Sequence, residues 1–398
     1  MYADRLQEIA PFRVMELMER AKLLESRGER VVHFEVGEPD FATAPSVIAA
    51  GQRALADGHT KYTQALGLPE LRARIAEYYQ DNAGIRIAPE RVVVTSGASG
   101  GLLLLCALLL NADDELLMSD PGYPCNEVFA RLTGAKPVKV VADASSGFQI
   151  SAAAVQAAWT PHTRGLLLAS PANPTGVMIS AAHLRELLAL CHGNQGVVIL
   201  DEIYQGLVYD GQPDGPEPAG YRTGLQLSSD IFILNSFSKY FGMTGWRLGW
   251  MVMPEEAVQA VTPLAQNLFI SPSSIAQHAA LAAFEPEAMV VHEQRRKTFQ
   301  QRRDLLAQGL QALGLHIPVL PTGAFYLYVD ISSTGLSSTE FCWRLIDEFQ
   351  VAVTPGNDFG AAEADRYVRF AYTTGEDDIA LGLERLAAAL QRWAGRCD

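Results

Sequence analysis

A lysine preceded by two serines and followed by an arginine carries the strongest chemical signal in the sequence. Ser236 ends the mostly apolar run IFILNS (231–236), Ser238 and Lys239 follow it, and Arg247 comes eight residues after the lysine. Apolar surroundings lower the pKa of an amine, so that it can attack an aldehyde. Serine hydroxyls and a guanidinium group also bind phosphate. The segment therefore indicates a nucleophilic lysine beside a phosphate site, although a lone lysine in a loop is usually only a solvated charge.

An acidic residue stands at the end of another apolar run. GVVILD (196–201) places Asp201 at the carboxyl end of an expected strand, where open parallel sheets bind ligands. Asp201 could cap the next helix, or it could pair with a protonated pyridine nitrogen and keep that ring an electron sink. Tyr204 could then donate to a phenolic oxygen on the ring. Asn173, in the turn SPANPTG (170–176), could do the same, although this turn needs no chemistry to be explained.

Strand, glycine-rich turn and apolar helix follow one another over residues 92–110. The amides of Ala98 and Ser99, at the start of that helix, would form an anion site suited to phosphate. Gly97, Ser99 and Gly101 also match the G-x-S-x-G pattern of a hydrolase, so a serine hydrolase that uses Ser99 is a competing hypothesis. That hypothesis needs several strands and an oxyanion turn upstream, and neither is evident before residue 92.

An aromatic residue follows the expected strand ELLMSD (115–120). Tyr123 lies in the turn segment SDPGYPCNEVF, where it could be an ordinary turn residue. Its position also suits stacking on a flat heteroaromatic ring. Both interpretations stay open from these residues alone.

Short apolar runs alternate with helical patterns through the first two thirds of the chain. Near-continuous apolar strands separated by helices predict an α/β fold, with a mostly parallel seven-stranded sheet flanked by helices. The expected strands are residues 92–96, 115–120, 136–141, 165–170, 196–201, 231–236 and 247–253.

The rest of the chain predicts a smaller α/β unit. Long helices are expected over about 285–313 and 379–395, with extended segments at 316–320, 324–330, 351–355 and 367–373. A helix over 11–27 and the extended VVHFEVGEPDF would complete this unit. We therefore expect three parts: an N-terminal arm with part of the small domain (1–45), a large ligand-binding domain (46–286) and a small C-terminal domain (287–398). The Gly-, Pro- and Asp-rich segment 210–224 is an expected surface loop.

Composition excludes several classes of protein. With 398 residues, 48% of them hydrophobic, the chain can bury a sizeable core, and a net charge of −14 argues against a nucleic-acid or anionic-membrane partner. Five scattered cysteines without a CxxC pair indicate a reducing cytoplasm rather than disulfides or zinc. The most apolar run, Leu102–Leu110, is far shorter than the roughly 20 residues that span a bilayer. The eight histidines are dispersed along the chain, so we expect no metal site.

Taken together, these segments resemble the fold-type I, class I/II family of pyridoxal-phosphate-dependent aminotransferases. SFSK followed by Arg247, and NPTG followed by DEIY, are specific in this order and spacing, and the resemblance runs from VGEPDF (36–41) to YVRFAYT (367–373). It implies that Lys239 binds the cofactor covalently and acts as the general base. It also implies that the cofactor phosphate is bound by Ala98, Ser99, Ser236 and Arg247. The ring nitrogen would be contacted by Asp201, the phenolic oxygen by Tyr204 and Asn173, and the ring face by Tyr123.

The resemblance also implies substrate contacts and a dimer. Arg369 matches the arginine that grips the substrate α-carboxylate, Gly37 matches the loop position whose backbone closes over that group, and Asn173 is a further contact there. Tyr62 looks like the tyrosine that reaches the phosphate of a neighbouring subunit. A homodimer with shared active sites is therefore expected.

Two positions depart from the family pattern. Ser99 stands where some aspartate-specific relatives have a lysine, so a neutral or aromatic L-α-amino acid is the expected donor and a 2-oxo acid the acceptor. Asn126 replaces a tyrosine that is common after the P-x-Y-P turn, which puts one substrate contact in doubt.

A carbon–sulfur β-lyase shares nearly every cofactor contact and is the nearest alternative. A cofactor-sensing regulator would need a basic DNA-binding module, for which the roughly 30 residues before the family match are too few.

Overall fold

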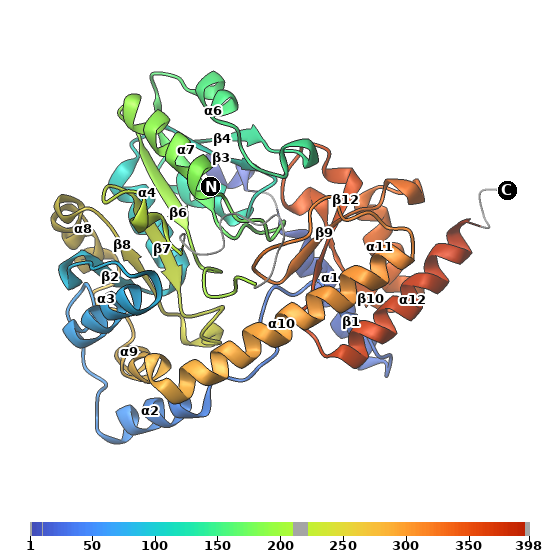
Figure 1. Cartoon of the computed structure of the whole chain (residues 1–398), viewed down its shortest axis with the longest axis horizontal. Coiled ribbons are helices and arrows are strands. Elements are labelled where there is room, and N and C mark those ends of the chain that lie inside the picture. Colours follow the sequence, from blue (N-terminus) through green and yellow to red (C-terminus); the bar gives the residue numbers. More distant parts are fainter. Residues whose placement is uncertain (1, 10, 210–221, 395–398) are drawn as a thin grey trace.

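Seven strands form one large sheet in the order β2-β8-β7-β6-β5-β3-β4, as the computed structural model shows (Figure 1). All neighbouring pairs are parallel except those of β8, which runs antiparallel to β2 and β7. This confirms the expected mostly parallel sheet. Its strands are β2 (Val92–Thr95), β3 (Glu115–Asp120), β4 (Lys136–Val141), β5 (Thr163–Ala169), β6 (Val197–Asp201), β7 (Phe232–Ser236) and β8 (Gly249–Val252).

Both faces of the sheet are buried, because successive side chains of a strand point to opposite sides. Leu116 and Met118 of β3 pack into one apolar cluster, and Leu117 packs into the other. Strands buried on both sides are therefore apolar at almost every position. The helices that flank the sheet are α2 (Pro45–Ala56), α3 (Pro69–Ala83), α4 (Gly97–Leu109), α5 (Cys125–Leu132), α6 (Ala152–Ala158), α7 (Ala181–Gly193), α8 (Glu255–Leu268) and α9 (Ser274–Leu281).

A smaller unit joins the N-terminal segment to the end of the chain (Figure 1). β1 (Val32–His33) pairs in parallel with β10 (Val351–Ala352), so residues 32 and 351 lie side by side. A second small sheet has the order β11-β12-β9, formed by Thr354–Pro355, Tyr367–Ala371 and Tyr326–Asp330. The helices of this unit are α1 (Arg13–Ser26), α11 (Ser338–Phe349) and α12 (Glu376–Ala394).

One long helix bridges the two units. α10 (Pro286–Ala312) extends from the neighbourhood of α2 and α9 to that of α12 (Figure 1). Pro286 at its first position fits a helix start, because the amide that proline lacks would have no partner there. The sequence-based expectation of a helix over about 285–313 is confirmed.

One expected extended segment was wrong. Residues 316–320 form no strand, and only His316 makes an isolated bridge, to Asp330. Pro318 has no amide hydrogen with which to continue a ladder. The other three extended segments of the small unit are β9, β10 with β11, and β12.

The structure describes residues 2–9, 11–209 and 222–394. Most of the expected surface loop at 210–224, and Cys397, lie outside these ranges. No helix within them combines the length and apolar character needed to cross a membrane.

Candidate active site

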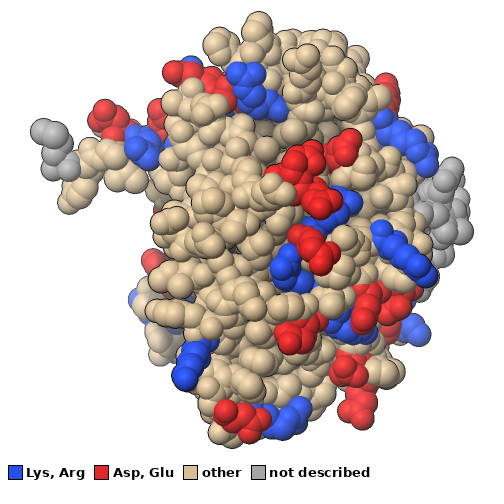
Figure 2. Space-filling view, turned by 90° about the vertical axis from the view of Figure 1, so that its left-hand side faces the viewer, with Lys and Arg blue, Asp and Glu red and all other residues tan. Residues whose placement is uncertain are grey.

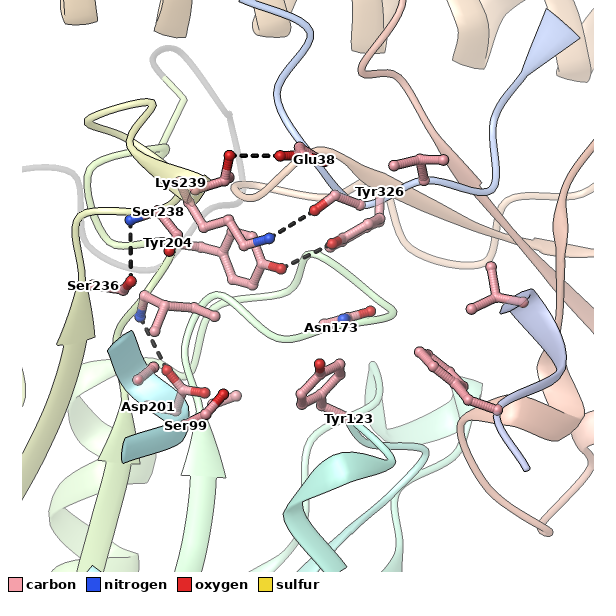
Figure 3. A pocket seen from close by; sticks show the side chains of 18 of the residues that line it. Glu38, Ser99, Tyr123, Asn173, Asp201, Tyr204, Ser236, Ser238, Lys239 and Tyr326 are labelled. Atoms are coloured by element: carbon pink, nitrogen blue, oxygen red, sulfur yellow. Dashed lines mark hydrogen bonds between the residues drawn. The ribbon is translucent and has the colours of Figure 1, made fainter. Parts of the chain in front are cut away.

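A pocket of about 350 Å³ opens at the carboxyl ends of the central strands, between the large sheet and the small unit (Figure 3). Its volume is typical of a small-molecule or cofactor site. Residues from β6, β7, the start of α4 and the turn after β5 meet residues from the N-terminal segment and from β9 and β12. All but one of the expected site residues line it: Gly37, Ala98, Ser99, Tyr123, Asn173, Asp201, Tyr204, Ser236, Lys239, Arg247 and Arg369.

Lys239 is half-buried and points into the middle of the pocket (Figure 3). Its Nζ donates to the carbonyl oxygen of Gly37 at 2.7 Å. Burial and the charge of Arg369, partly offset by Glu38, together lower the pKa of Lys239 to about 8. A neutral amine is therefore well populated near pH 8, as a nucleophile or general base requires.

Asp201 ends β6 and is buried at the base of the pocket. Its Oδ1 accepts the Ile203 N–H at 3.1 Å. Burial raises the pKa of Asp201 to about 7, while this amide and the charge of Lys239 act in the opposite direction. A cationic group against this carboxylate would lower that pKa and be held strongly in return, because few water molecules screen the pair.

The anion-binding end of the pocket combines a helix start with an arginine. Ala98 and Ser99 belong to the first turn of α4, whose amides have no partners within the helix. A Cβ added to Gly97 would lie 2.7 Å from Arg247 Nη2, so this guanidinium rests directly against the helix start. Ser236 also faces this end, where its Oγ accepts the N–H of Ser238 at 3.0 Å.

Two tyrosines meet inside the pocket. The hydroxyls of Tyr204 and Tyr326 are 2.8 Å apart, and both rings are buried (Figure 3). Tyr123 stands across the pocket from Lys239, where an aromatic face is available for a flat ring. Sequence reasoning missed Tyr326, whose place at the start of the apolar β9 was the one available signal.

Arg369 lies on β12 and reaches the pocket from the small unit. Its Nη1 donates to Asn173 Oδ1 at 3.0 Å and its Nη2 to the Glu35 carbonyl oxygen at 2.7 Å. Its buried Nε has no hydrogen-bond partner among the described residues. A buried guanidinium with a donor to spare is suited to a planar carboxylate.

The loop of Gly37 crosses the pocket above Lys239. A Cβ at Gly37 would overlap Tyr326 Oη, so a larger residue here would displace the buried Tyr326 side chain. The next residue, Glu38, accepts a hydrogen bond from Thr244 Oγ1. Glu38 also lines the pocket, and sequence reasoning did not single it out.

An apolar side of the pocket was missed altogether. The turn before α1 and the first turns of this helix contribute four residues, and Phe129 and Leu102 lie on the same lining. In the sequence these positions show only helical amphipathicity, which α1 uses equally for its core contacts. The four residues are Phe12, Val14, Met15 and Met18.

Two singled-out residues lie elsewhere. Tyr62 is 78% exposed and does not line this chain's pocket. Asn126 is buried beside a separate cavity of about 10 Å³, which it shares with Tyr123 and Asn173. No histidine is among the described residues that line the main pocket, so Ser99 has no general base of the kind that a serine hydrolase uses.

These features fit pyridoxal phosphate residue by residue. The helix start with Arg247 suits the phosphate, the buried carboxylate of Asp201 suits a protonated ring nitrogen, and Lys239 suits the aldehyde. The spare donor of Arg369 suits the substrate carboxylate. The arrangement is that of a pyridoxal-phosphate enzyme acting on an α-amino acid.

Comparison with known proteins gives the family. The family Aminotransferase class I and II matches residues 29–386. The chain is 36% identical to the valine–pyruvate aminotransferase of Mycobacterium tuberculosis, over 96% of this chain and 97% of that one. It is 35% identical to the aspartate/prephenate aminotransferase of Thermus thermophilus, over 98% of each chain. The crystal structure of an aminotransferase from Mycobacterium tuberculosis superposes with a TM-score of 0.93 at 36% identity, covering 98% of this chain and 99% of that one.

The chain belongs to the class I and II aminotransferases, which depend on pyridoxal phosphate. It is an aminotransferase that transfers an amino group between an amino acid and a 2-oxo acid.

Proposed function

We propose that the amino donor is a neutral aliphatic or aromatic L-α-amino acid, and that the site residues act as the family resemblance implies. The observation that carries this proposal is the charge of the pocket lining. Among the described residues, its cations are Lys239, Arg247 and Arg369, and each of these already has a role.

A side-chain carboxylate would therefore have no cation left to bind it. The lining also contains Glu35, Glu38 and Asp201, which would repel it. Burying an unpaired carboxylate costs several kcal/mol, whereas the apolar residues of the α1 side gain by covering a hydrophobic side chain. The balance favours leucine or phenylalanine over aspartate.

The role that we propose for each residue in the reaction follows from its position in the pocket. When bound, pyridoxal phosphate supplies an aldehyde that captures the amino group and a protonated ring that accepts the electrons released at Cα. Arg369 orients the substrate by its carboxylate. Lys239 removes the Cα proton through Nζ, and Asp201 keeps the proton on the ring nitrogen.

The relatives leave the substrate open. One relative is named for valine and pyruvate and another for aspartate and prephenate, at nearly the same identity. Our proposal of a neutral donor is therefore supported by the residues that line the pocket rather than by the names of the relatives.

A panel of amino acids tested against several 2-oxo acids measures the donor directly. We expect kcat/KM to be highest for a neutral aliphatic or aromatic donor. A panel in which only dicarboxylic donors react would overturn it.

A carbon–sulfur β-lyase is the second candidate, because it would use nearly the same cofactor contacts. Incubation with a cysteine conjugate, without any oxo acid, separates the two activities. Stoichiometric release of pyruvate and ammonia at a rate above that of transamination would favour the lyase.

We also propose a cytoplasmic homodimer in which Tyr62 reaches the phosphate of the partner's site. Tyr62, Leu268 and Ile270 are large apolar residues that are more than half exposed. Figure 2 shows a broad area free of Lys, Arg, Asp and Glu on the side of the molecule where α8 lies. Such a surface is typical of an interface between subunits. The four described cysteines are all unpaired, as a reducing compartment requires.

Light scattering of the purified protein tests the dimer, which should have twice the mass of the 43.2 kDa chain. Tyr62→Phe should weaken cofactor retention without changing that mass. We further propose that the domain boundaries lie near residues 45 and 286, a division supported by the separate sheets on either side of them.

A further inference from the structure

One short segment of the small unit supports the start of α1. Asp358 lies between β11 and β12, and its carboxylate accepts the N–H of Arg13 at 3.1 Å and the N–H of Val14 at 2.8 Å. The N-cap residue of α1, Phe12, makes no side-chain hydrogen bond to the helix. Asp358 therefore takes the place of an N-cap residue, from a position more than 340 residues away in the sequence.

The next residue, Phe359, contacts the opposite side of the pocket, at Arg369 and at the turn that contains Tyr123. The ring of Phe359 lies 4.7 Å from the guanidinium of Arg369. The carbonyl oxygen of Phe359 also accepts a hydrogen bond, of 2.8 Å, from the N–H of Gly122, the residue that precedes Tyr123. Two successive residues thus contact the helix that lines the apolar side and the arginine suited to the carboxylate.

We propose that Asp358 is a positioning residue that determines which substrate side chains are accepted, because it fixes the distance between α1 and Arg369. The inference rests on the proposed function, in which Arg369 binds the α-carboxylate and the substrate side chain packs against α1. A substrate held by its carboxylate has a side chain of fixed reach. The position of α1 then decides whether that side chain meets a packed apolar surface or a gap.

An aspartate is well suited to this role. Its two oxygens accept two amides at once, and its charge is stabilised by the positive end of the α1 dipole. Asparagine has a single acceptor oxygen and would turn an NH₂ group toward the second amide. Asp358→Asn should therefore release the first turn of α1 with almost no change in volume.

The test compares kcat/KM for alanine, leucine and phenylalanine in Asp358→Asn and in a matched control. Asp365→Asn changes an exposed carboxylate of the same loop, which accepts from Asn357 Nδ2 at 2.8 Å and makes no hydrogen bond to α1 among the described residues. In Asp358→Asn we expect about a tenfold loss for leucine and phenylalanine and a much smaller loss for alanine. Asp365→Asn should leave all three values unchanged.

A second pair of variants removes the same contact from the side of the helix. Arg13→Pro deletes one of the two amide donors, and proline is well tolerated at the first helical position. Arg13→Ala keeps that amide and, like Arg13→Pro, removes the Arg13 side chain, with its bond from Nη1 to Thr339 Oγ1 and its charge near Asp358, so that the two variants differ in the amide. We expect Arg13→Pro, but not Arg13→Ala, to shift the substrate preference in the same direction as Asp358→Asn. This pair decides the question if Asp358→Asn fails to fold.

Hydrogen exchange supplies a readout besides activity. Amides of the first two turns of α1 should exchange faster in Asp358→Asn, while those of β6 and β7 stay protected. Equal losses for all three substrates, or an unchanged preference, would overturn the positioning role. A wild-type enzyme that accepts no neutral amino acid would instead overturn the proposed function, so the two failures are distinguishable.

Discussion

The two walls of the pocket hold their residues by different means. The sheet wall comes from strand ends and the turns that follow them, and comprises Ala98, Ser99, Asn173, Asp201, Tyr204, Ser236 and Lys239. The outer wall comes from the N-terminal segment, β9 and β12, and comprises Phe12, Val14, Met15, Met18, Gly37, Tyr326 and Arg369. The sheet wall belongs to one continuous sheet. The outer wall joins separate parts of the chain through a few long-range hydrogen bonds, such as those from Val14 N–H to Asp358 and from Arg369 to the Glu35 carbonyl oxygen.

This difference separates the reaction from the choice of substrate. The sheet wall carries the half-buried lysine and the buried carboxylate with shifted pKa values, which in the proposed mechanism act on every substrate whatever its side chain. The outer wall carries Arg369, which we propose binds the substrate carboxylate, and the apolar residues of α1. Changes in the sheet wall should therefore affect all substrates equally, whereas changes in the apolar part of the outer wall should affect some substrates more than others.

The largest effect is expected from Lys239→Ala. It removes the residue that we propose as both the covalent anchor and the general base, so the rate of the half-reaction should fall about 10⁴-fold or more. The loss should be the same for alanine and phenylalanine within a factor of two or three, as measured by single-turnover absorbance. Borohydride treatment should fix the cofactor to the wild type but not to this variant.

Lys136→Ala is the control for that measurement, since Lys136 is an exposed lysine paired with Asp113. A Lys239→Ala variant that retains a reducible link to the cofactor would contradict the assignment of the lysine.

Asp201→Asn should have the next largest effect. Asparagine can keep the hydrogen bond from the Ile203 N–H but lacks the charge that holds a proton on the ring nitrogen. We expect kcat to fall about 10²- to 10³-fold for every substrate, with the thermal midpoint nearly unchanged or raised. Asp230→Asn, at an exposed position, is the control. Near wild-type turnover in Asp201→Asn would leave this residue a purely structural role.

Arg369→Lys acts on the outer wall but at the part shared by all substrates. Lysine is a point charge and cannot donate two parallel bonds to a carboxylate. KM should rise about 10- to 100-fold for all amino acids, and kcat should change less. A rise in KM confined to one class of side chain would show that Arg369 contacts the side chain instead.

The smallest effects concern two histidines, one near each wall. His33 is bonded to Glu35, which lines the outer side of the pocket, at 2.8 Å and to Glu25 at 3.0 Å. The bond to Glu35 raises the pKa of His33 to about 9 against the opposing effect of burial. Its stabilising contribution is therefore complete below about pH 6.5 and is lost as the pH rises through 9. His33→Gln should reduce the alkaline fall of the melting temperature by about 2 °C.

His292 behaves in the opposite way. Its ring centroid lies 5.4 Å from those of Tyr240 and Phe241, the two residues that follow Lys239 in the sequence. Burial lowers the pKa of His292 to about 4. Because the folded state favours the neutral ring, stability is lost as the pH falls from about 6.5 toward 4. His292→Phe should therefore flatten the acid side of the melting profile and leave the alkaline side as in the wild type. A change on the alkaline side would contradict this account.

The sheet wall could be predicted from the sequence because its residues follow apolar runs. Asp201 ends the apolar strand β6 and Lys239 lies three residues after the end of β7, and a parallel sheet gathers such strand ends at one edge. The outer wall could not be predicted in this way. Met15 and Met18 come near the pocket because α1 packs on the small unit and is bonded to Asp358, and no local pattern encodes these long-range contacts.

Arg369 and Gly37 were found only through the family resemblance. An arginine in β12 has the same pattern as a strand charge, and its place beside Asn173 depends on the packing of the small unit against the sheet. The expected strand at 316–320 was wrong because apolar residues alone do not supply the amide that Pro318 lacks.

The most direct test of the two-wall account is the ratio of kcat/KM for phenylalanine to that for aspartate in the wild-type enzyme. Measured in single turnovers on the loaded enzyme, it compares the two side chains at a common reaction centre. With three cations already assigned and an apolar surface on α1, we predict that phenylalanine exceeds aspartate by at least about tenfold. A clear preference for aspartate would contradict the account, because it would require a cation at the outer wall.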